Sequence, residues 1–339
     1  MDIAVTRLHP ADEQGAQQAY EISAAVAAAD VPDFPPPDRD YFFAQLSIPF
    51  PGTEDEWVLA RVGGEAAGYA QIELPQLDNV ENVVVDLFVH PAYRRRGVGR
   101  ALHAYVVRRA HELSRKRIMG FSVEALPGGL PRDTAGTGFA EACGATSALV
   151  DVRRRLDLAD VDTARLDGML AEAWRHAGGY SLVQWTDATP DEYLDDVAYL
   201  DSRLVEDAPM GDLAWEPHKV DADRVRAVDA VLARRGRRMY HTGIRHDATG
   251  RLVAWTALSV NPTPDWHAWQ QITIVEPRHR GHRLGVIVKI ENLRYARAVR
   301  PALRVVDTYN AASNRHMIGI NEAIGFRPVD AWHNWQQVV

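Results

Sequence analysis

The sequence predicts an α/β protein with mixed sheets, built from two copies of one fold. Its 339 residues exceed one ordinary hydrophobic core and fit two domains of about 150 residues each. Strand-like and helix-like segments also follow the same order in both halves of the chain. We therefore expect a first domain over 1–156, a helical linker over 157–178 and a second domain over 179–339.

Hydrophobic periodicity and turn residues locate the elements of each half. In the first half we expect strands at 3–7, 56–62, 66–74, 82–90, 118–125 and 147–156, helices at 11–29 and 97–115, and an irregular, proline-rich connector at 31–40. In the second half we expect strands at 181–185, 237–246, 251–260, 269–277 and 303–310, helices near 190–206, 221–235, 284–299 and 314–323, and a closing strand. The Gly63-Gly64 pair between two strands predicts a hairpin.

A fixed offset of 186 residues relates the two halves. It separates Pro91 from Pro277, and it also separates two further pairs, Arg94 from Arg280 and Gly99 from Gly285. A shared register with the same strand, loop and helix around it indicates a duplicated domain.

Composition excludes several classes of protein. A net charge of −8 argues against a general nucleic-acid binder and is compatible with a cationic small-molecule partner. The single Cys143 cannot form an internal disulfide, which suits a reducing compartment. No apolar run approaches the roughly 20 residues that span a bilayer, and the N-terminal residues lack the pattern of a signal peptide. We expect a cytoplasmic monomer or homodimer that binds neither membrane nor nucleic acid.

The strongest local signal is the segment LFVHPAYRRRGVGRAL at 87–102. An apolar strand leads into a basic, glycine-containing loop, and the loop opens an amphipathic helix. Unpaired N–H groups at the start of a helix, together with the helix dipole, form an anion site. Gly97 and Gly99 let the backbone approach a diphosphate closely, and the arginines before them add positive charge. The alternative is an ordinary strand-to-helix turn with solvated arginines.

This segment resembles the GNAT superfamily of N-acetyltransferases, whose R/Q-x-x-G-x-G/A motif is matched in full by Arg94–Gly99. The resemblance extends over nearly the whole chain as a tandem pair, an architecture shared with mycothiol synthase. It implies that the loop binds the pyrophosphate of acetyl-coenzyme A, the acyl donor. It also implies that the preceding strand splays from its neighbour and holds the pantetheine arm. The implied donor-binding residues of the first half are Phe88, Val89, Arg94, Arg95, Arg96, Gly97, Val98, Gly99 and Arg100.

The second half departs from the motif. Arg280 and Gly285 fit it, but Arg283 stands in the place of the first motif glycine, and Gly281 lies two positions earlier. Coenzyme binding there stays an open alternative. Its candidate residues are Val275, Arg280, Gly281, His282, Arg283, Leu284, Gly285, Asn310 and Asn314. The segments at 206–217, 279–285 and 308–328 resemble a bacterial subgroup of tandem acetyltransferases, a likeness that bears on the fold and assigns no substrate.

Asp86 is the candidate general base, because it is the single charge within VVVDLFV and family bases are often acidic residues on this strand. A desolvated carboxyl has a raised pKa, as a base requires. The alternatives are an acid on the solvent side of the sheet or one paired with an arginine. The matching position of the second half is Ile272. The family's acid, a tyrosine four residues before a closing glycine, is absent from both halves, where Ala140 and Asn321 stand instead.

Other candidates have simple structural alternatives. Asn310 and Asn314 either contact a pantetheine amide or form turns and caps. The acids of the first connector and just before it either attract a cationic acceptor or form a solvated loop; they are Asp30, Asp33, Asp38 and Asp40. We expect no metal site, because the spacings of His279, His282 and His316 match no familiar ligand pattern, and we expect Cys143 to be a small core residue.

The predicted function is acyl transfer from acetyl-coenzyme A to the amine of a small molecule, directly and without a covalent enzyme intermediate. A non-catalytic module that senses acyl-coenzyme A and a protein-lysine acetyltransferase are the alternatives. The sequence identifies neither the acceptor nor the length of the acyl chain.

Overall fold

The computed structural model describes residues 2–339, which divide into two compact units. Unit 1 contains the residues up to Asp151 together with Met210–Glu216 and Asp330–Val339. Unit 2 contains Val152–Pro209 and Pro217–Val329. This division differs from the linear one predicted from the sequence, because the last residues of the chain belong to the first unit and the expected linker belongs to the second.

Unit 1 is a mixed sheet with helices on both faces. Its elements are β1 (Ile3–Leu8), α1 (Glu13–Asp30), α2 (Arg39–Ser47), β2 (Thr53–Val62), β3 (Glu65–Pro75), β4 (Asn82–Val89), a 3₁₀ turn (Pro91–Tyr93), α3 (Val98–Glu112), β5 (Arg117–Ala125), α4 (Ala135–Ala142) and the first half of β6 (Thr146–Asp157). The strand order is β1-β2-β3-β4-β5-β12, where β12 (Arg327–Val338) is antiparallel to β5 from Asp330 onward. The pair β4–β5 is parallel.

Local chemistry explains where these elements begin and turn. Asp12 caps α1, because its side chain accepts a hydrogen bond of 2.9 Å from the Gly15 N–H. Gly63 and Gly64 form the predicted hairpin turn with φ angles of 58° and 93°, which glycine adopts at no steric cost. Helix α2 follows the proline-rich connector and is capped by Asp38; the sequence pattern does not predict this helix.

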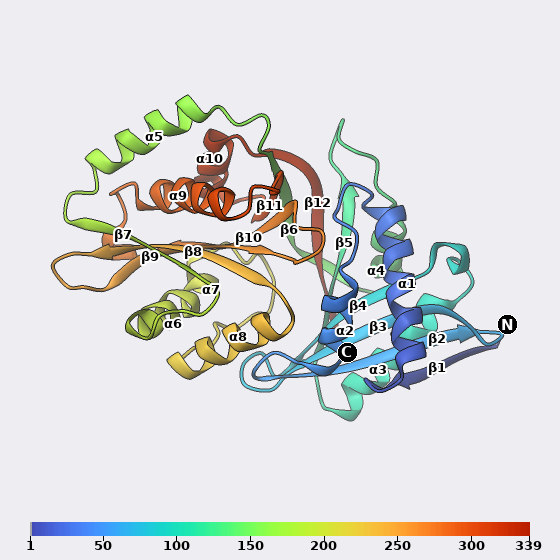
Figure 1. The fold of residues 1–339 in the computed structure, drawn as a ribbon. Helices are drawn as coiled ribbons and strands as arrows, with labels where there is room; N and C mark the ends of the chain where they lie inside the picture. The colour runs from blue at the N-terminus through green and yellow to red at the C-terminus, as the bar shows by residue number, and fades with distance from the viewer. Residues whose placement is uncertain (1) are drawn as a thin grey trace. The chain divides into compact units, whose positions relative to one another are not determined.

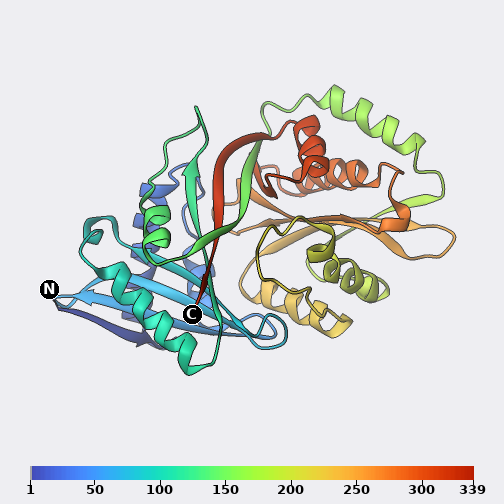
Figure 2. The same ribbon diagram turned by 180° about the vertical axis from the view of Figure 1, so that it is seen from behind.

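The strands of unit 1 bury a different set of side chains on each face. On one face, Val98, Leu102 and Val106 of α3 pack against apolar residues of β2, β3 and β4. On the other face, α1 and α2 cover Trp57 and Tyr69. Figures 1 and 2 show α1 and α3 on opposite sides of these strands. Alternate residues of β4 therefore point to different helices.

Unit 2 repeats the plan. Its elements are the second half of β6, α5 (Thr163–Arg175), β7 (Tyr180–Thr186), a 3₁₀ turn (Asp191–Tyr193), α6 (Leu194–Ser202), α7 (Leu204–Asp207), α8 (Ala222–Arg234), β8 (Arg238–His246), β9 (Leu252–Val260), β10 (His267–Val275), a 3₁₀ turn (Pro277–His279), α9 (Leu284–Val299), β11 (Val305–Ala311), α10 (Arg315–Ile324) and the start of β12. The strand order is β6-β11-β10-β9-β8-β7, with β10 parallel to β11.

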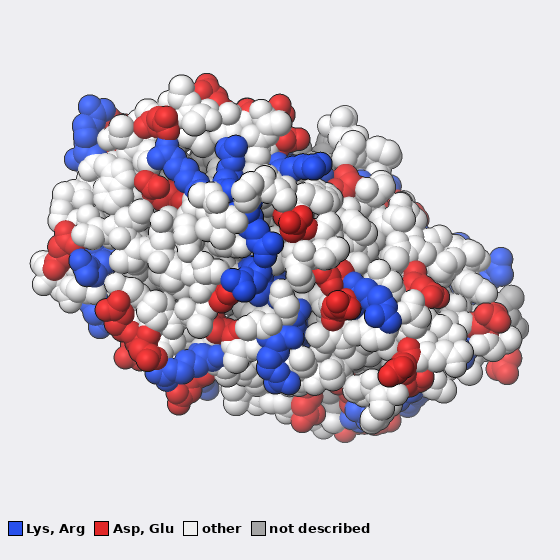
Figure 3. Space-filling model, in the orientation of Figure 1, with Lys and Arg blue, Asp and Glu red and all other residues white. Residues whose placement is uncertain are grey.

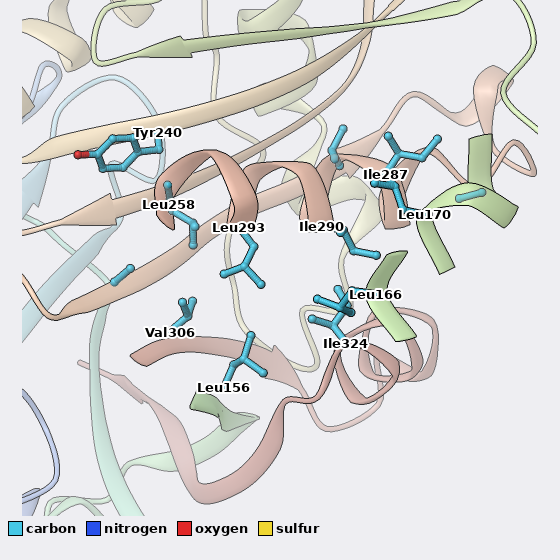
Figure 4. Close-up of a cluster of buried hydrophobic side chains, with 14 of the residues drawn as sticks. Leu156, Leu166, Leu170, Tyr240, Leu258, Ile287, Ile290, Leu293, Val306 and Ile324 are labelled. Carbon is cyan, nitrogen blue, oxygen red and sulfur yellow. The ribbon is translucent and has the colours of Figure 1, made fainter. Parts of the chain in front are cut away.

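Helix α9 forms the centre of the core of unit 2. Figure 4 shows Ile290 and Leu293 of this helix pointing toward Leu156 and Leu166, which are all buried. Helices α5 and α9 lie on one side of strands β7–β10, and α6 and α8 lie on the other (Figure 1). The sheet of this unit is therefore covered on both faces.

Hydrogen bonds repeat at the predicted offset. The His90 N–H donates to the Ala67 carbonyl at 3.0 Å, and the Glu276 N–H donates to the Val253 carbonyl at 2.8 Å, 186 residues later. The side chains of His90 and Glu276 each cap the 3₁₀ turn that follows. The two units thus share local geometry as well as element order, as expected of a duplicated fold.

Figure 3 shows the charged side chains on one face of the molecule. Basic and acidic side chains are mixed over the face drawn in Figure 3. Among residues 2–339, no helix combines the length and apolar character needed to cross a membrane.

Candidate functional site

In unit 1, strand β4 separates from β5 part of the way along its length. The two strands pair at Asn82, Val83 and Val84, and within the described chain their pairing stops there. On its other side β4 continues to pair with β3 as far as Val89, opposite Gly68. The last five residues of β4 therefore have a strand neighbour on one side and a gap on the other.

The direction of the backbone groups along β4 determines which of them face this gap. The His90 N–H donates to Ala67 on β3, and the direction of the backbone N–H and C=O groups alternates from one residue to the next along an antiparallel strand. The backbone groups of Phe88 therefore also point toward β3. Leu87 and Val89 are directed away from it, into the gap. The backbone contacts with the donor at Phe88 and Val89 stay predictions; in this register the backbone groups of Val89 face the gap and those of Phe88 face β3. In unit 2, β10 pairs with β11 only as far as Trp269. The same reasoning directs the backbone groups of Val275 away from β9, to the side where that pairing has ended.

Helix α3 begins directly beyond the gap with N–H groups that have no partner within the helix. Its cap, Gly97, has a φ of 90° and offers no side-chain hydrogen bond, and the first N–H bonded within the helix is that of Ala101. The N–H groups of Val98, Gly99 and Arg100 are therefore without intrahelical partners. A Cβ on Gly99 would lie 3.2 Å from the Phe139 ring of α4, a tight contact that requires the ring to move by a few tenths of an ångström.

Arg94 does not point toward these N–H groups. Its guanidinium forms two hydrogen bonds with Asp30, at 2.7 and 2.8 Å, and one of 2.7 Å with Asp133. Its Nε donates to the Val89 carbonyl at 3.3 Å. Arg280 of unit 2 likewise donates to the Val275 carbonyl, at 3.2 Å, and pairs with Asp207. The Arg94 side chain thus links the loop to its strand, and its contact with a phosphate stays a prediction.

Three other arginines supply positive charge at the start of α3. Arg95, Arg96 and Arg100 are exposed, and within residues 2–339 none of them forms an ion pair with a carboxylate. The Arg96 guanidinium lies over the Tyr93 ring, 5.7 Å from its centroid. Free N–H groups of the first helical turn and guanidinium groups without a carboxylate partner together make this end of the helix suitable for an anion.

Asp86 lies on β4 at the start of the gap, on the face covered by α1 and α2. It is half-buried, and no hydrogen bond or ion pair to it is found within the described chain. Desolvation raises the pKa of Asp86 to about 6, and the charge of Asp55 adds to the rise. The arginine-paired alternative for Asp86 is therefore wrong in this structure. Tyr69, buried on the same face, also has a raised pKa, first because of burial.

Unit 2 lacks an acid at the corresponding place. A bulge in β10 sets Gln271 and Ile272 together opposite Ala257, and Ile272 is buried in an apolar cluster. Two tryptophans of this cluster stack on either side of the His241 ring. The centroid of the His241 ring lies 5.0 Å from that of Trp185 and 5.9 Å from that of Trp255. Burial lowers the pKa of His241 to about 3, so this imidazole is neutral at physiological pH.

The loop of unit 2 keeps the backbone conformation of unit 1 with the residue types exchanged. Arg283 caps α9 in the left-handed conformation, with a φ of 60°, where unit 1 has Gly97. Gly281 has a φ of 90°, where unit 1 has Arg95 with a φ of 61°. Leu284 is buried, and His282 bonds to the His176 carbonyl at 3.0 Å. A helix start of the same shape is thus present in both units.

Several candidate side chains prove to be structural. Asn314 caps α10 by accepting from the Met317 N–H, and Asn310 accepts a hydrogen bond of 2.6 Å from Asn321. In the first connector, Asp38 caps α2 and Asp33 forms an ion pair with the buried Arg132. Together with Asp30, which pairs with Arg94, these acids hold the connector in place, whereas Asp40 is exposed beside Arg39.

No group of three potential metal-ligating side chains occurs within residues 2–339. His279 bonds to the Tyr180 hydroxyl at 2.9 Å. Cys143 is half-buried after α4, and burial raises the pKa of its thiol. The thiol is thus less ionised than a free cysteine at neutral pH.

Comparison with known proteins identifies this fold. A family model described as the acetyltransferase (GNAT) family matches residues 19–125. A solved tandem GNAT protein from the clavulanic acid biosynthesis pathway covers 99% of this chain and 98% of its own, with 32% identity and a TM-score of 0.86. The chain belongs to the GNAT acetyltransferase family, and its two-unit fold is that of a tandem GNAT protein.

More distant structures share the fold alone. A GCN5-related N-acetyltransferase from Sphaerobacter thermophilus is 16% identical, with a TM-score of 0.62 over 99% of this chain and 95% of its own. A putative acetyltransferase from Pyrococcus horikoshii is 13% identical, with a TM-score of 0.56 over 99% of this chain and 89% of its own. A comparison with curated protein sequences found no significant match.

Proposed function

We propose that unit 1 transfers an acetyl or other acyl group from acyl-coenzyme A directly to the amine of a small molecule. The observation that carries the proposal is the arrangement along one strand, loop and helix. Asp86 with its raised pKa, the gap-facing backbone of Leu87 and Val89, and the free N–H groups of α3 follow one another within fifteen residues. This order supports the proposal that a base, a binding edge and an anion site lie in one continuous segment.

The segment provides complementary groups for each part of the donor. The N–H groups of Val98, Gly99 and Arg100, with the guanidinium groups of Arg95 and Arg96, suit the diphosphate. The gap-facing backbone of Leu87 and the N–H of Val89 suit the amides of the pantetheine arm. The Val89 carbonyl is already engaged by Arg94, so its N–H is the available group.

The chemistry requires a neutral amine. Asp86, directly or through a water molecule, accepts the proton that the ammonium or the attacking amine loses. With a pKa of about 6 it is ionised at neutral pH and yet more basic than an ordinary aspartate. Asp55 and Glu73 are half-buried on the same face of neighbouring strands, which makes this side of the sheet acidic and suits a cationic acceptor.

The departing thiolate does not require a tyrosine. A thiol has an ordinary pKa of about 8.5, so the thiolate is a tolerable leaving group at neutral pH and can take its proton from water. The proposal is therefore compatible with Ala140 and Asn321 at the two positions where the family has a tyrosine.

A paired experiment tests donor binding. Titration of the protein with acetyl-coenzyme A in a calorimeter is expected to show saturable binding, and Gly97→Val is expected to weaken it. Gly64→Val is the matched control, because Gly64 has nearly the same φ, 93°, in a hairpin turn of the same unit. Equal affinity of both variants and the unchanged protein would contradict the assigned diphosphate site.

Turnover is tested by release of free thiol in the presence of a panel of small amines. Amine-dependent release that is lost in Asp86→Asn supports the proposal. Donor binding without release from any amine would favour the alternative, a non-catalytic acyl-coenzyme A-binding module. Unit 2 supports that alternative. Its strand β10 also stops pairing with β11 part of the way along, and α9 has the same helix start, but the face of the sheet that corresponds to the one with Asp86 is apolar.

A further inference from the structure

Three aromatic side chains of unit 1 form an exposed group, which we call the aromatic cluster: Phe34, Phe121 and Trp332. The centroid of the Trp332 ring lies 5.7 Å from that of Phe34 and 5.4 Å from that of Phe121. Phe121 is 48% exposed, and the other two are partly exposed. A contiguous exposed apolar group marks a binding surface more often than a single exposed side chain does.

The aromatic cluster shares a face of the sheet with Asp86. Side chains alternate between the two faces along a strand. On β5, Ile118 packs on the α3 side, so Phe121 points to the other side. On β4, Val85 and Leu87 pack on the α3 side, so Asp86 also points away from it. Both side chains therefore lie on the face that α1 and α2 cover in part.

The register of β4 and β5 brings Asp86 and Phe121 to the same level. Each stands two residues beyond the last paired residue of its strand. The residues just before them, Val85 and Gly120, are still adjacent, because a Cβ on Gly120 would lie 3.4 Å from the Val85 carbonyl oxygen. Asp86 and Phe121 therefore stand on opposite sides of the gap where it begins, with backbones about 5 Å or more apart.

A buried ion cluster holds the aromatic rings in place. The Arg132 side chain, which is 1% exposed, pairs with Asp33 of the proline-rich connector and, at 2.8 Å, with Asp330 of β12. Asp330 also accepts a hydrogen bond of 2.9 Å from the Trp332 indole N–H. The connector that carries Phe34 and the strand that carries Trp332 are thus tied together. A surface ordered in advance loses little conformational entropy when a ligand binds to it.

We propose that the aromatic cluster selects the acceptor of unit 1, a primary amine that carries an aromatic or bulky apolar group a short linker away from its nitrogen. The ammonium group lies toward Asp86, on the face that also carries Asp55 and Glu73. The apolar group lies across the gap, against Phe121 and Trp332. The carboxylate and the apolar surface are complementary to the two ends of such a molecule. The inference rests on the proposed acyl transfer at Asp86 and adds the class of amine.

The test compares two amines of equal charge, 2-phenylethylamine and propylamine, with acetyl-coenzyme A as the donor. The readout is the ratio of their kcat/KM values, measured by thiol release. We expect the unchanged protein to favour 2-phenylethylamine. Phe121→Ala should lower the ratio about tenfold, which corresponds to about 1.4 kcal/mol and is within the range for one aromatic contact.

Two further variants control for effects other than the loss of the ring. Phe121→Tyr keeps the ring and should retain the ratio. Leu77→Ala is the matched control, because Leu77 is also exposed, at 57%, and precedes β4 at the end away from the gap. Its ratio should equal that of the unchanged protein.

Binding measured without turnover separates this inference from the proposed function. Titrations followed by saturation-transfer NMR give a Kd for 2-phenylethylamine whether or not the amine is acylated, and Phe121→Ala should raise it about tenfold. Binding that depends on Phe121 without thiol release would support the amine-binding surface and contradict acyl transfer. Thiol release with the same amine ratio in Phe121→Ala and the unchanged protein would overturn the inference alone.

Two other results would also overturn it. One is the absence of 2-phenylethylamine binding. The other is a change of oligomeric state in Phe121→Ala, seen by size-exclusion chromatography, with the amine ratio unchanged. The aromatic cluster would then be a contact between copies of the chain.

Discussion

Replacement of Asp86 by asparagine should stabilise the protein in a pH-dependent way. The carboxyl has an ordinary pKa of 3.8 and a pKa of about 6 in the folded chain, chiefly because of desolvation. The folded state therefore holds this proton more tightly than the unfolded state, so stability falls as pH rises from about 4 to above 6. The full difference is about 3 kcal/mol, because each pKa unit corresponds to about 1.4 kcal/mol. Between pH 4.5 and pH 8 the advantage of the Asp86→Asn variant should grow by about 2 kcal/mol.

Urea unfolding at several pH values measures this effect, and steady-state kinetics of the same variant measures the catalytic one. We expect kcat of the unchanged protein to rise as pH increases through about 6, and Asp86→Asn to lose about 100-fold or more of that rate. Asp55→Asn removes the second cause of the raised pKa and should move the acidic limb to lower pH. A stability difference that is the same at pH 4.5 and pH 8 would refute the reasoning, because a carboxyl whose pKa is raised in the folded state predicts a difference that grows with pH.

Three further predictions concern the framework of the two units. Arg94→Ala removes the hydrogen bonds to Asp30 and Asp133 and should cost about 2 kcal/mol in urea unfolding; it should also weaken acetyl-coenzyme A binding, and Arg94→Lys should restore little of either because lysine lacks the forked geometry. Asp307→Asn should cost about 3–5 kcal/mol, because the fully buried Asp307 carboxylate pairs with Arg153, Arg155 and His267; a variant as stable as the original protein would contradict this. Burial alone would raise the pKa of Asp307, but hydrogen bonds from Arg155 and His267 hold it well below its usual value, so its contribution should persist at neutral pH and decline only as pH falls below about 4; thermal melts from pH 7 down to pH 3 would show it. Gly97→Ala should lower the free energy of unfolding by about 1 kcal/mol, because Gly97 has a left-handed φ. Arg283→Gly, at the matching left-handed position of unit 2, should raise the free energy of unfolding by a similar amount.

Much of the fold could be predicted because its signals are local. The Gly63-Gly64 turn, the spacing of Val98, Leu102 and Val106 on α3, and the segment from β4 to Gly97 each depend on neighbouring residues. Helix α2 was missed because it is short, rich in aromatic residues and preceded by three prolines, so it carries weak periodicity. Tertiary contacts of Phe42 and Leu46 stabilise it.

The site was predicted less completely, for a different physical reason. The motif located the loop and Asp86, but the direction of a side chain depends on partners that are distant in sequence. Arg94 turns to Asp30, 64 residues earlier, and Leu87 faces the gap because of the register with β3. The bulge in β10 has no marker in the sequence, since neither glycine nor proline accompanies it.

The last residues of the chain complete the sheet of the first unit. From Asp330 to Val338 each residue of β12 is paired with β5, and the Val339 N–H donates to the Lys116 carbonyl. During synthesis on the ribosome, the β5 edge of the N-terminal half therefore stays unpaired until residues 330–338 have been translated. A fragment cut after residue 156 would keep that edge unpaired and be prone to aggregation. The two copies of the fold consequently cannot be separated by a single cut, and a tail fused to the C-terminus would emerge from the N-terminal unit.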